Sequence, residues 1–353
     1  MDLSVRDLRE VLGFGVTMVG VNLADARLEG ADLRMAWLEG ANLGNARLER
    51  ADLRGAQLES ADLRGAWMEG INLSGAWLDG TNPTGARMER ANLRGAMLER
   101  ANLSRTQLEE ADLTGARLDR ANITRAGLAA ADLRGARLKG VDLRGARMQR
   151  ANLRGADLGG AALNGVVLEE AILSYARMEQ VDMLGAELQG ADLRDARLGH
   201  ANLAGARLEG ADLTAAALVW VDLSHAAMKG ARLSYAEMNK VVLRHADLRL
   251  TKWANTSIQA LPAQFADLRG AEELTQGQLD QMIGNVQTLL PNVGNLSIPS
   301  CWKTPPEGFD ALVDRVAEVR ADFLCPAGEE PQRTGTPLAV DAPYPPGHPL
   351  ADR

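Results

Sequence analysis

Three of the four histidines stand at regularly spaced positions. His200, His225 and His245 all have residue numbers divisible by five, and the last two are twenty residues apart. Imidazole binds metals and transfers protons near neutral pH. Two ligands in register are fewer than a metal site needs, so we expect ordinary surface residues and no metal. The sequence also lacks a phosphate-binding glycine loop, a nucleophile elbow and an HExxH motif, which predicts no cofactor and no enzymatic activity.

The two cysteines do not indicate chemistry either. Cys301 and Cys325 lie outside any CxxC-type spacing, and one pair is no disulfide framework. The apolar run 11–24 lacks a basic leader and a cleavage pattern, so we expect no signal peptide. At 14 residues the run is also too short to span a bilayer. We therefore expect a cytoplasmic protein without membrane insertion.

Large apolar side chains recur at spacings that suit binding. Two tryptophans and two other long side chains follow one another every twenty residues, and a further tryptophan falls halfway between. Aligned surface aromatics suggest a contact patch for a protein partner. The alternative is an incidental surface, or one that another segment of the chain covers. The candidate partner-binding residues are Trp37, Gln57, Trp77, Met97, Trp67, Val167, Ile172 and Trp220.

A five-residue repeat must position these side chains. Residues 21–250 divide into 46 consecutive pentapeptides, whose third residue, the centre, is Leu in 37 and whose first residue is Ala in 37. The other three positions are polar, charged or Gly. A helix advances about 500° in five residues, and a strand alternates with period two, so neither keeps both apolar positions on one face. The chain must instead turn a corner at every repeat, and the frequent fifth-position Gly suits a corner.

The repeat has the form A-(D/N)-L-x-x, as in Ala51-Asp-Leu-Arg-Gly55 and Ala201-Asn-Leu-Ala-Gly205. It resembles the repeat of the pentapeptide repeat family over about two-thirds of the chain. The resemblance implies an all-β solenoid, a right-handed quadrilateral parallel β-helix with two inward residues on each side. Residues 21–250 would then form about 11–12 coils of twenty residues, a rod of roughly 55 Å. Residues twenty apart would lie in one column.

The segments outside the repeat are expected to be helical or irregular. Ser4 and Asp7 resemble a capping box, which predicts a short N-terminal capping helix within residues 1–20. The frame fails after Leu250, although residues 251–271 resemble a degenerating last coil. The β-helix is therefore predicted to cover residues 21–271.

Beyond it, residues 272–325 are predicted to form a C-terminal segment of helices and loops. Thr275 opens a predicted helix to Ile283, and residues 307–324 form a second, amphipathic one. The pattern LTxxQLD…LP…P..W in this segment resembles a tail of bacterial members of the family. Residues 326–353 hold 7 of the 13 prolines and are predicted to be disordered.

Charge is nearly balanced in the repeat. Residues 21–250 carry 31 acidic and 30 basic side chains, and residues 251–353 carry 13 and 7. The second position alternates Asp or Asn with Arg, Trp, Gln or Met, and the fourth position often has the opposite sign, as in Asp52 beside Arg54. We interpret this rhythm as a solvated surface that limits like-charge repulsion between coils. No basic footprint for direct nucleic-acid binding is present.

These features favour a non-enzymatic scaffold that presents columns of side chains to an unidentified protein partner. The C-terminal segment would either cover the end of the coils or pair with a second copy as a homodimer. The alternative function comes from the resemblance: quinolone-resistance members mimic duplex DNA and bind DNA gyrase. A DNA mimic needs a continuous acidic surface, and those members are rich in Phe at the centre. Here the repeat is near neutral and no centre is Phe, so we disfavour mimicry.

Overall fold

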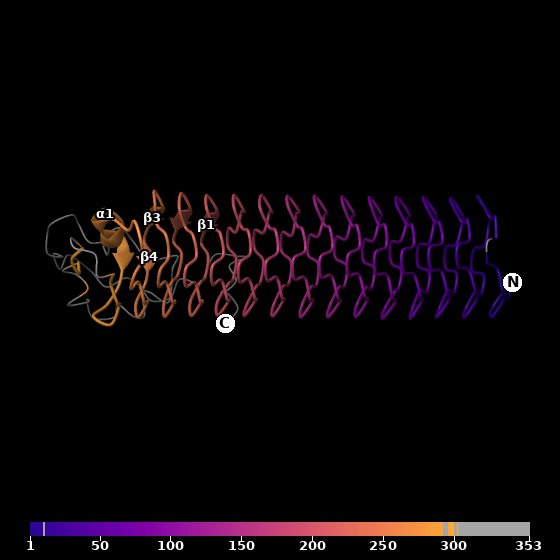
Figure 1. The fold of residues 1–353 in the computed structure, drawn as a ribbon, viewed down its shortest axis with the longest axis horizontal. Coiled ribbons are helices and arrows are strands. Elements are labelled where there is room, and N and C mark those ends of the chain that lie inside the picture. Colours follow the sequence, from indigo (N-terminus) through magenta and orange to yellow (C-terminus); the bar gives the residue numbers. More distant parts are fainter. Residues whose placement is uncertain (10, 292–295, 300–301, 303–353) are drawn as a thin grey trace, which may run out of the picture. The chain divides into compact units, whose positions relative to one another are not determined.

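Residues 1–9, 11–291, 296–299 and 302 are described by the computed structural model, which shows stacked coils of twenty residues (Figure 1). Second-position residues pair in parallel with the residue twenty positions later, and a fully paired coil has four such bridges. One coil contributes, for example, Asn22↔Asn42, Arg27↔Arg47, Asp32↔Asp52 and Trp37↔Gln57. The described residues belong to two compact units, Met1–Arg177 and Met178–Arg353. Each unit confirms the predicted solenoid of parallel coils with four sides.

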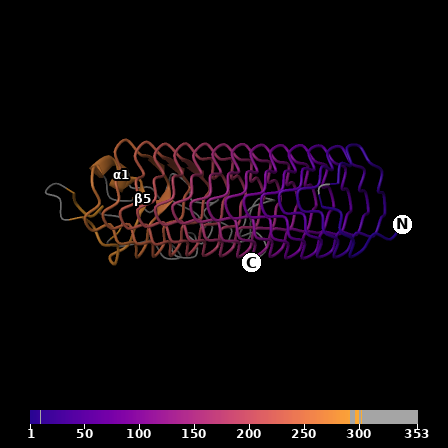
Figure 2. The same ribbon diagram turned by 45° about the vertical axis from the view of Figure 1, so that its right-hand side comes forward.

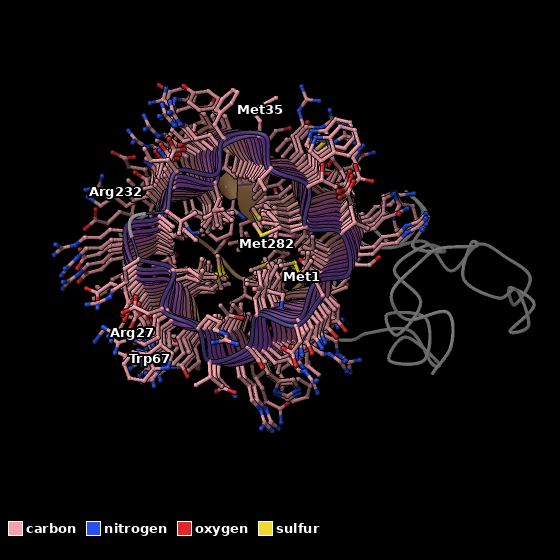
Figure 3. The ribbon with its side chains drawn as sticks, turned by 90° about the vertical axis from the view of Figure 1, so that its right-hand side faces the viewer. Met1, Arg27, Met35, Trp67, Arg232 and Met282 are labelled. Carbon is pink, nitrogen blue, oxygen red and sulfur yellow. The ribbon has the colours of Figure 1, made fainter. Side chains whose placement is uncertain are left out.

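The interior of each unit is made of the two apolar positions of the repeat. In the first unit Leu23 and Ala26 have no exposed surface, and Leu143 is equally buried. Viewed along the coils, Arg27 and Trp67 project outward from the same side (Figure 3). A fully buried leucine contributes about 1.5–3 kcal/mol to stability, and every repeat with a buried leucine adds such a contribution. The inward assignment of centre and alanine is confirmed.

A turn at each corner joins one side to the next. The N–H of Ala26 donates to the carbonyl of Leu23 at 3.1 Å, which closes a four-residue turn. The third residue of this turn, Asp25, has φ of 57°. A positive φ at that place is typical of a type II turn and explains why glycine is frequent at the fifth position. Gly55, with φ of 66°, has the same conformation.

The backbone amides explain the Asp/Asn rhythm of the second position. Within one repeat, Leu23 N–H donates to the carbonyl of Asn42 and Asp25 N–H to that of Gly44, at 2.7 and 2.9 Å. These bonds and the turn leave the fourth-position N–H without a backbone acceptor. Asn22 supplies one, because its Oδ1 accepts the N–H of Ala24 at 3.2 Å. We call this contact the Asx cap; it removes the cost of an unmade hydrogen bond.

The predicted capping helix at residues 1–20 is wrong. Asp2 bridges Asn22 and Asp7 bridges Arg27, so this segment forms another coil. The N–H of Leu3 donates to the carbonyl of Asn22 at 2.8 Å, and Asp2 makes an Asx cap to the N–H of Ser4 at 2.9 Å. Pairing along the neighbouring coil supplies more hydrogen bonds than an isolated helical turn would, and it overrides the local capping pattern.

Regular strands are found only in the second unit, among the described residues. Strands β1 (Ala217–Val219), β2 (Glu237–Asn239) and β3 (Ser257–Gln259) form a parallel sheet in the order β1-β2-β3. Their register still advances by twenty, as in Glu237↔Ser257, so the coils continue past Leu250. Figure 2 shows the same succession of coils from another angle. Elsewhere one residue on each side is paired, and the side is too short to form a strand.

The period ends where β4 (Leu261–Pro262) pairs with β5 (Met282–Ile283). Leu261 is opposite Met282, an offset of 21 instead of 20. The helix predicted from Thr275 is confirmed at its start, since Thr275 and Gln278 form a capping box. It is shorter than predicted: α1 covers Gln276–Asp280, because Met282 and Ile283 join β4 as a strand.

Side chains from α1 and from Trp302 tie this end together. Gln278 Nε2 donates to the carbonyls of Trp253 and Thr256 at 3.0 and 2.9 Å. The buried Trp302 indole donates to the carbonyl of Met282 at 3.1 Å. The predicted helix at 307–324, the predicted disorder at 326–353 and both cysteines lie outside the described residues. No helix in the described ranges has the length and apolar content to cross a bilayer.

Candidate functional site

Four of the predicted contact residues lie in one column of the first unit. Parallel bridges link Trp37 to Gln57, Gln57 to Trp77 and Trp77 to Met97. We call these four residues the Trp37 column. The second position points away from the core, and the two indoles are therefore each 47% exposed, whereas Gln57 and Met97 are half-buried. The predicted alignment is confirmed.

An acidic column lies beside it on the same side of the coil. The fourth-position residues are Glu39, Glu59, Asp79 and Glu99, each two residues after a member of the Trp37 column. Glu99 pairs with Arg117. Within the described parts of the chain, Glu39, Glu59 and Asp79 make no ion pair. Three carboxylates without a cation therefore flank two exposed indoles.

The carboxylates of Glu39 and Glu59 share one orientation. In each, Oε2 is buried and has no hydrogen-bond partner among the described groups, which leaves Oε1 for an outside donor. Asp79 is shorter and is turned toward the backbone, where it accepts the N–H of Glu99 at 2.7 Å. This acidic column was not predicted from the sequence. The available signal was the recurrence of acidic residues every twenty positions from 39 to 119.

Trp67 lies on the side opposite the Trp37 column in the same coils and has cations of its own. The guanidinium carbons of Arg47 and Arg87 lie 5.8 and 4.9 Å from its ring centroid. Arg47 also pairs with Oε1 of Glu29 and with Oε1 of Glu49, both at 3.2 Å. The Trp67 ring therefore already has cation–π contacts within the chain, and Arg47 beside it already has ion pairs.

Val167 and Ile172 are not brought to the Trp37 column. Val167 bridges Arg147 and is half-buried, while Ile172 bridges Asn152 and is 37% exposed. The two residues lie on different sides of one coil, because five residues separate them.

Trp220 belongs to the second unit and stands at a fifth position, with φ of 62°. Its ring stacks on His200, with centroids 6.1 Å apart, and Lys240 Nζ lies 4.1 Å from its centroid. The indole is half-buried between these neighbours. The structure thus places it in a corner column rather than on a flat side.

The predicted stacking of His225 and His245 is confirmed. Their rings are 4.7 Å apart and nearly parallel, and Phe265 continues the stack at 4.5 Å from His245. Burial, together with the charges of His225 and Arg244, lowers the pKa of His245. Among the described residues, no three His, Cys, Asp or Glu groups lie together in a way that could hold a metal ion.

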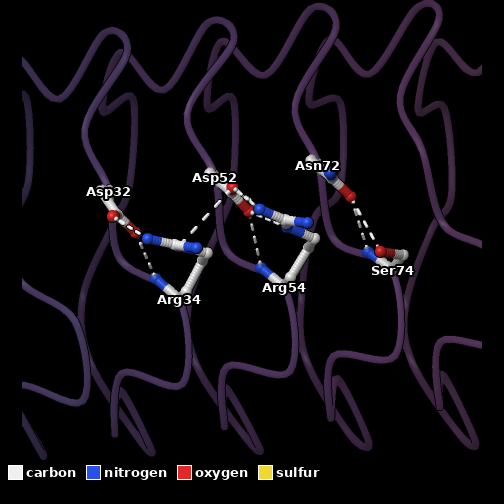
Figure 4. A network of polar contacts seen from close by, with 6 residues as sticks. All are labelled: Asp32, Arg34, Asp52, Arg54, Asn72 and Ser74. Atoms are coloured by element: carbon white, nitrogen blue, oxygen red, sulfur yellow. Dashed lines mark hydrogen bonds and ion pairs between the residues drawn. The ribbon is translucent and has the colours of Figure 1, made fainter.

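Asp and Arg two residues apart neutralise much of the remaining surface (Figure 4). Asp32 accepts from Arg34 Nη2 at 2.6 Å, and Asp52 accepts from Arg54 Nη2 at 2.7 Å. In the next coil the pair is Asn72 and Ser74. The Asx cap from Ser74 N–H to Asn72 Oδ1 is still made there, although neither side chain is charged. The second-position carboxylate therefore caps the backbone and also binds an arginine.

These pairs predict a loss of stability in acid. The hydrogen-bonded Arg134 and Arg144 guanidinium groups hold the pKa of Asp132 and Asp142 below its usual value, although burial opposes the effect. A depressed folded-state pKa stabilises the fold above the unfolded value, roughly 3.9 for Asp, and that contribution is lost as pH falls toward the folded value. We expect the free energy of unfolding to decrease between about pH 5 and pH 2.

A double variant provides the control for this prediction. In Asp132→Asn/Asp142→Asn the amide oxygen keeps the Asx cap, as Asn152 does for the N–H of Arg154 at 3.2 Å. Denaturant midpoints measured from pH 7 to pH 3 should therefore change less in the variant than in the wild type. Equal changes in the two proteins would show that these pairs do not cause the acid sensitivity.

The sequence matches the model of a known protein family. The family model described as pentapeptide repeats matches in eight copies, from residues 15–45 to residues 191–230. One solved structure similar to this chain is HetL from the cyanobacterium Nostoc sp. strain PCC 7120, a pentapeptide repeat protein involved in heterocyst differentiation regulation. The two sequences are 34% identical, the match covers 63% of this chain and 89% of HetL, and the TM-score is 0.33. QnrB1, a plasmid-mediated fluoroquinolone resistance protein, is 18% identical, with coverage of 62% and 91% and a TM-score of 0.30.

A pentapeptide repeat protein from the Arabidopsis thaliana thylakoid lumen is 25% identical, with coverage of 40% of this chain and 84% of that protein and a TM-score of 0.22. No curated protein matches the sequence. The family model spans well over half of the chain, in the same segment where the coils of twenty residues are observed. The chain belongs to the pentapeptide repeat family.

Proposed function

We propose that this chain is a non-enzymatic interaction module whose contact surface is the Trp37 column. The observation that carries the proposal is the pair of half-exposed indoles, Trp37 and Trp77, in register on one side of a rigid stack of coils. Tryptophan is enriched among the residues that dominate binding energy at protein interfaces. Both indoles stand on backbone held by inter-coil hydrogen bonds, so little conformational entropy is lost when a partner binds.

The alternative, mimicry of DNA toward gyrase, has less support. A DNA-like surface requires a dense, uncompensated row of negative charge. The Asp32 and Asp52 carboxylates are each bonded to an arginine of the same repeat. The side opposite the Trp37 column likewise pairs Glu29 and Glu49 with Arg47. We therefore favour a protein partner that is recognised through the exposed indoles.

Affinity capture from the organism that encodes the chain tests this function. The variant Trp37→Ala/Trp77→Ala should lose the partners that the wild-type chain retains. Its melting temperature should stay close to that of the wild type, because surface substitutions usually change stability by about 0.5 kcal/mol or less. Trp67→Ala is the matched control, since its indole is already engaged by Arg47 and Arg87. Retention of the same partners by both variants would disprove the proposed surface.

A further inference from the structure

We propose that the side of the first unit that carries the Trp37 column binds an extended, arginine-bearing segment of a protein partner. The inference rests on the proposed function and adds the chemistry of the partner. Its site consists of Trp37 and Trp77 with the carboxylates of Glu39, Glu59 and Asp79. Each guanidinium of the segment would stack on an indole and pair with a neighbouring carboxylate.

The opposite side of the same coils shows how such a cation is held. There Arg47 and Arg87 lie against the Trp67 ring. Arg47 is also bonded through Nε to Glu29 Oε1 and through Nη2 to Glu49 Oε1. Arginine suits this position because its planar guanidinium stacks on an aromatic face while its N–H groups reach carboxylates at the edge. The repeat itself thus builds a tryptophan–arginine–glutamate arrangement.

The Trp37 side repeats this arrangement without the arginine. Glu39 and Glu59 bury Oε2 and leave Oε1 unbonded, in the same manner as Glu29 and Glu49 bury Oε2. Gln57 stands in the column between the two indoles, where Arg47 stands next to Trp67 on the other side. The first arginine of the column is Arg117, which pairs with Glu99. From Trp37 to Trp77 the column holds no arginine, so an outside cation is the group that these indoles and the unpaired carboxylates beside them lack.

The spacing of the indoles defines the conformation of the partner. Trp37 and Trp77 are two coils apart, which corresponds to about 10 Å at the usual inter-strand distance. A polyproline II segment rises about 3.1 Å per residue with three residues per turn, so side chains at i and i+3 lie on one face about 9 Å apart. In a β-strand, residues i and i+3 point to opposite faces. The site therefore fits an R-x-x-R segment in the polyproline II conformation.

The C-terminal segment of this chain has the wrong charge to be that partner. Residues 303–353 carry nine acidic and five basic side chains. The same carboxylates that attract an arginine-bearing segment would repel a net acidic one. We therefore assign the site to a separate protein.

Peptide binding to the full-length chain tests the inference. The probe is a fluorescein-labelled, proline-rich peptide with two arginines three residues apart, followed by fluorescence anisotropy at low and high salt. We expect saturable binding that weakens with salt, and binding at least several-fold weaker when the arginines are replaced by lysines or placed two residues apart. Trp37→Ala/Trp77→Ala and Glu39→Gln/Glu59→Gln should each weaken binding at least tenfold.

The variant Gln57→Arg gives the sharpest comparison. It supplies an internal arginine between the two indoles, as Arg47 does for Trp67, and should weaken peptide binding at least tenfold with an unchanged melting temperature. Gln107→Arg is the matched control. It adds the same charge on the side opposite the Trp37 column, where residue 107 bridges Arg87, and should leave peptide binding unchanged.

Two outcomes would overturn the inference: no binding of the arginine peptide, or equal binding by the Gln57→Arg variant and the wild type. Loss of captured partners in Trp37→Ala/Trp77→Ala, together with no peptide binding, would retain the proposed function and remove only the arginine chemistry. Unchanged capture would remove the proposed function itself.

Discussion

Replacement of Leu143 by lysine is expected to unfold the coils around it. The leucine side chain has no exposed surface, and the leucine N–H donates to the carbonyl of Ala162 at 2.8 Å. Its column neighbours, Ile123 and Leu163, are only 1% exposed. The variant loses the burial of leucine, about 2–5 kcal/mol, and places an unpaired ammonium in an apolar interior. The sum is comparable with the whole stability of an ordinary domain, roughly 5–15 kcal/mol.

Chemical denaturation monitored by circular dichroism measures this effect. Leu143→Met is the matched control, because methionine has a similar volume and already occupies the centre at Met148, where it is fully buried. Its cost should be about 1.5 kcal/mol or less. If the lysine variant unfolds at the same denaturant concentration as the wild type, Leu143 does not lie in the core of the first unit.

Replacement of Trp253 by alanine is expected to open the C-terminal coils of the second unit. The indole occupies a centre, has no exposed surface, and donates from Nε1 to Thr251 Oγ1 at 2.8 Å. Gln278 reaches across to the Trp253 carbonyl, so the residue connects the last coils to α1. Truncation of a buried tryptophan costs about 3–5 kcal/mol through lost contacts and the cavity that remains.

Hydrogen exchange resolves where this loss occurs. Amides of residues 248–291 should lose protection in Trp253→Ala, whereas those of residues 21–150 should keep theirs, because contacts in a solenoid reach only neighbouring coils. Trp253→Phe keeps most of the ring but removes the indole N–H. Its protection at residues 248–291 should lie between that of the wild type and that of Trp253→Ala. Unchanged protection at residues 248–291 would show that Trp253 does not hold this end together.

The sequence predicted the repeat geometry because that geometry depends on a local pattern. Leucine at each centre and alanine two residues earlier can be buried together only if the chain turns at every repeat. The columns of residues twenty apart followed from the four-sided coil of the family. The sequence alone therefore predicts the alignment of Trp37, Gln57, Trp77 and Met97. It also predicts the stack of His225 on His245.

Only the tertiary structure determined the conformation of the segments that flank the regular repeat. The segment 1–20 contains a local helix signal at Ser4 and Asp7, yet Leu3 and Leu8 continue the spacing of the centres and are bonded to the second coil. Local propensity is a weak guide when a neighbouring coil offers a ready ladder of hydrogen bonds. Trp253 similarly continues the core beyond Leu250, although it does not match the leucine of the repeat.

Side-chain partners were also beyond the reach of the sequence, because distances between columns depend on the coil. The repeat placed Trp37 in one column with Gln57 and Trp77, and Trp67 ten residues away from each of the latter two. Only the structure shows that Arg47 reaches Glu29 and Glu49, while Glu39 and Glu59 have no such partner among the described residues. The sequence by itself determined which residues point outward and which share a column. The tertiary structure determined which of those outward charges are already paired, because ion pairs between coils depend on side-chain positions that no linear spacing specifies.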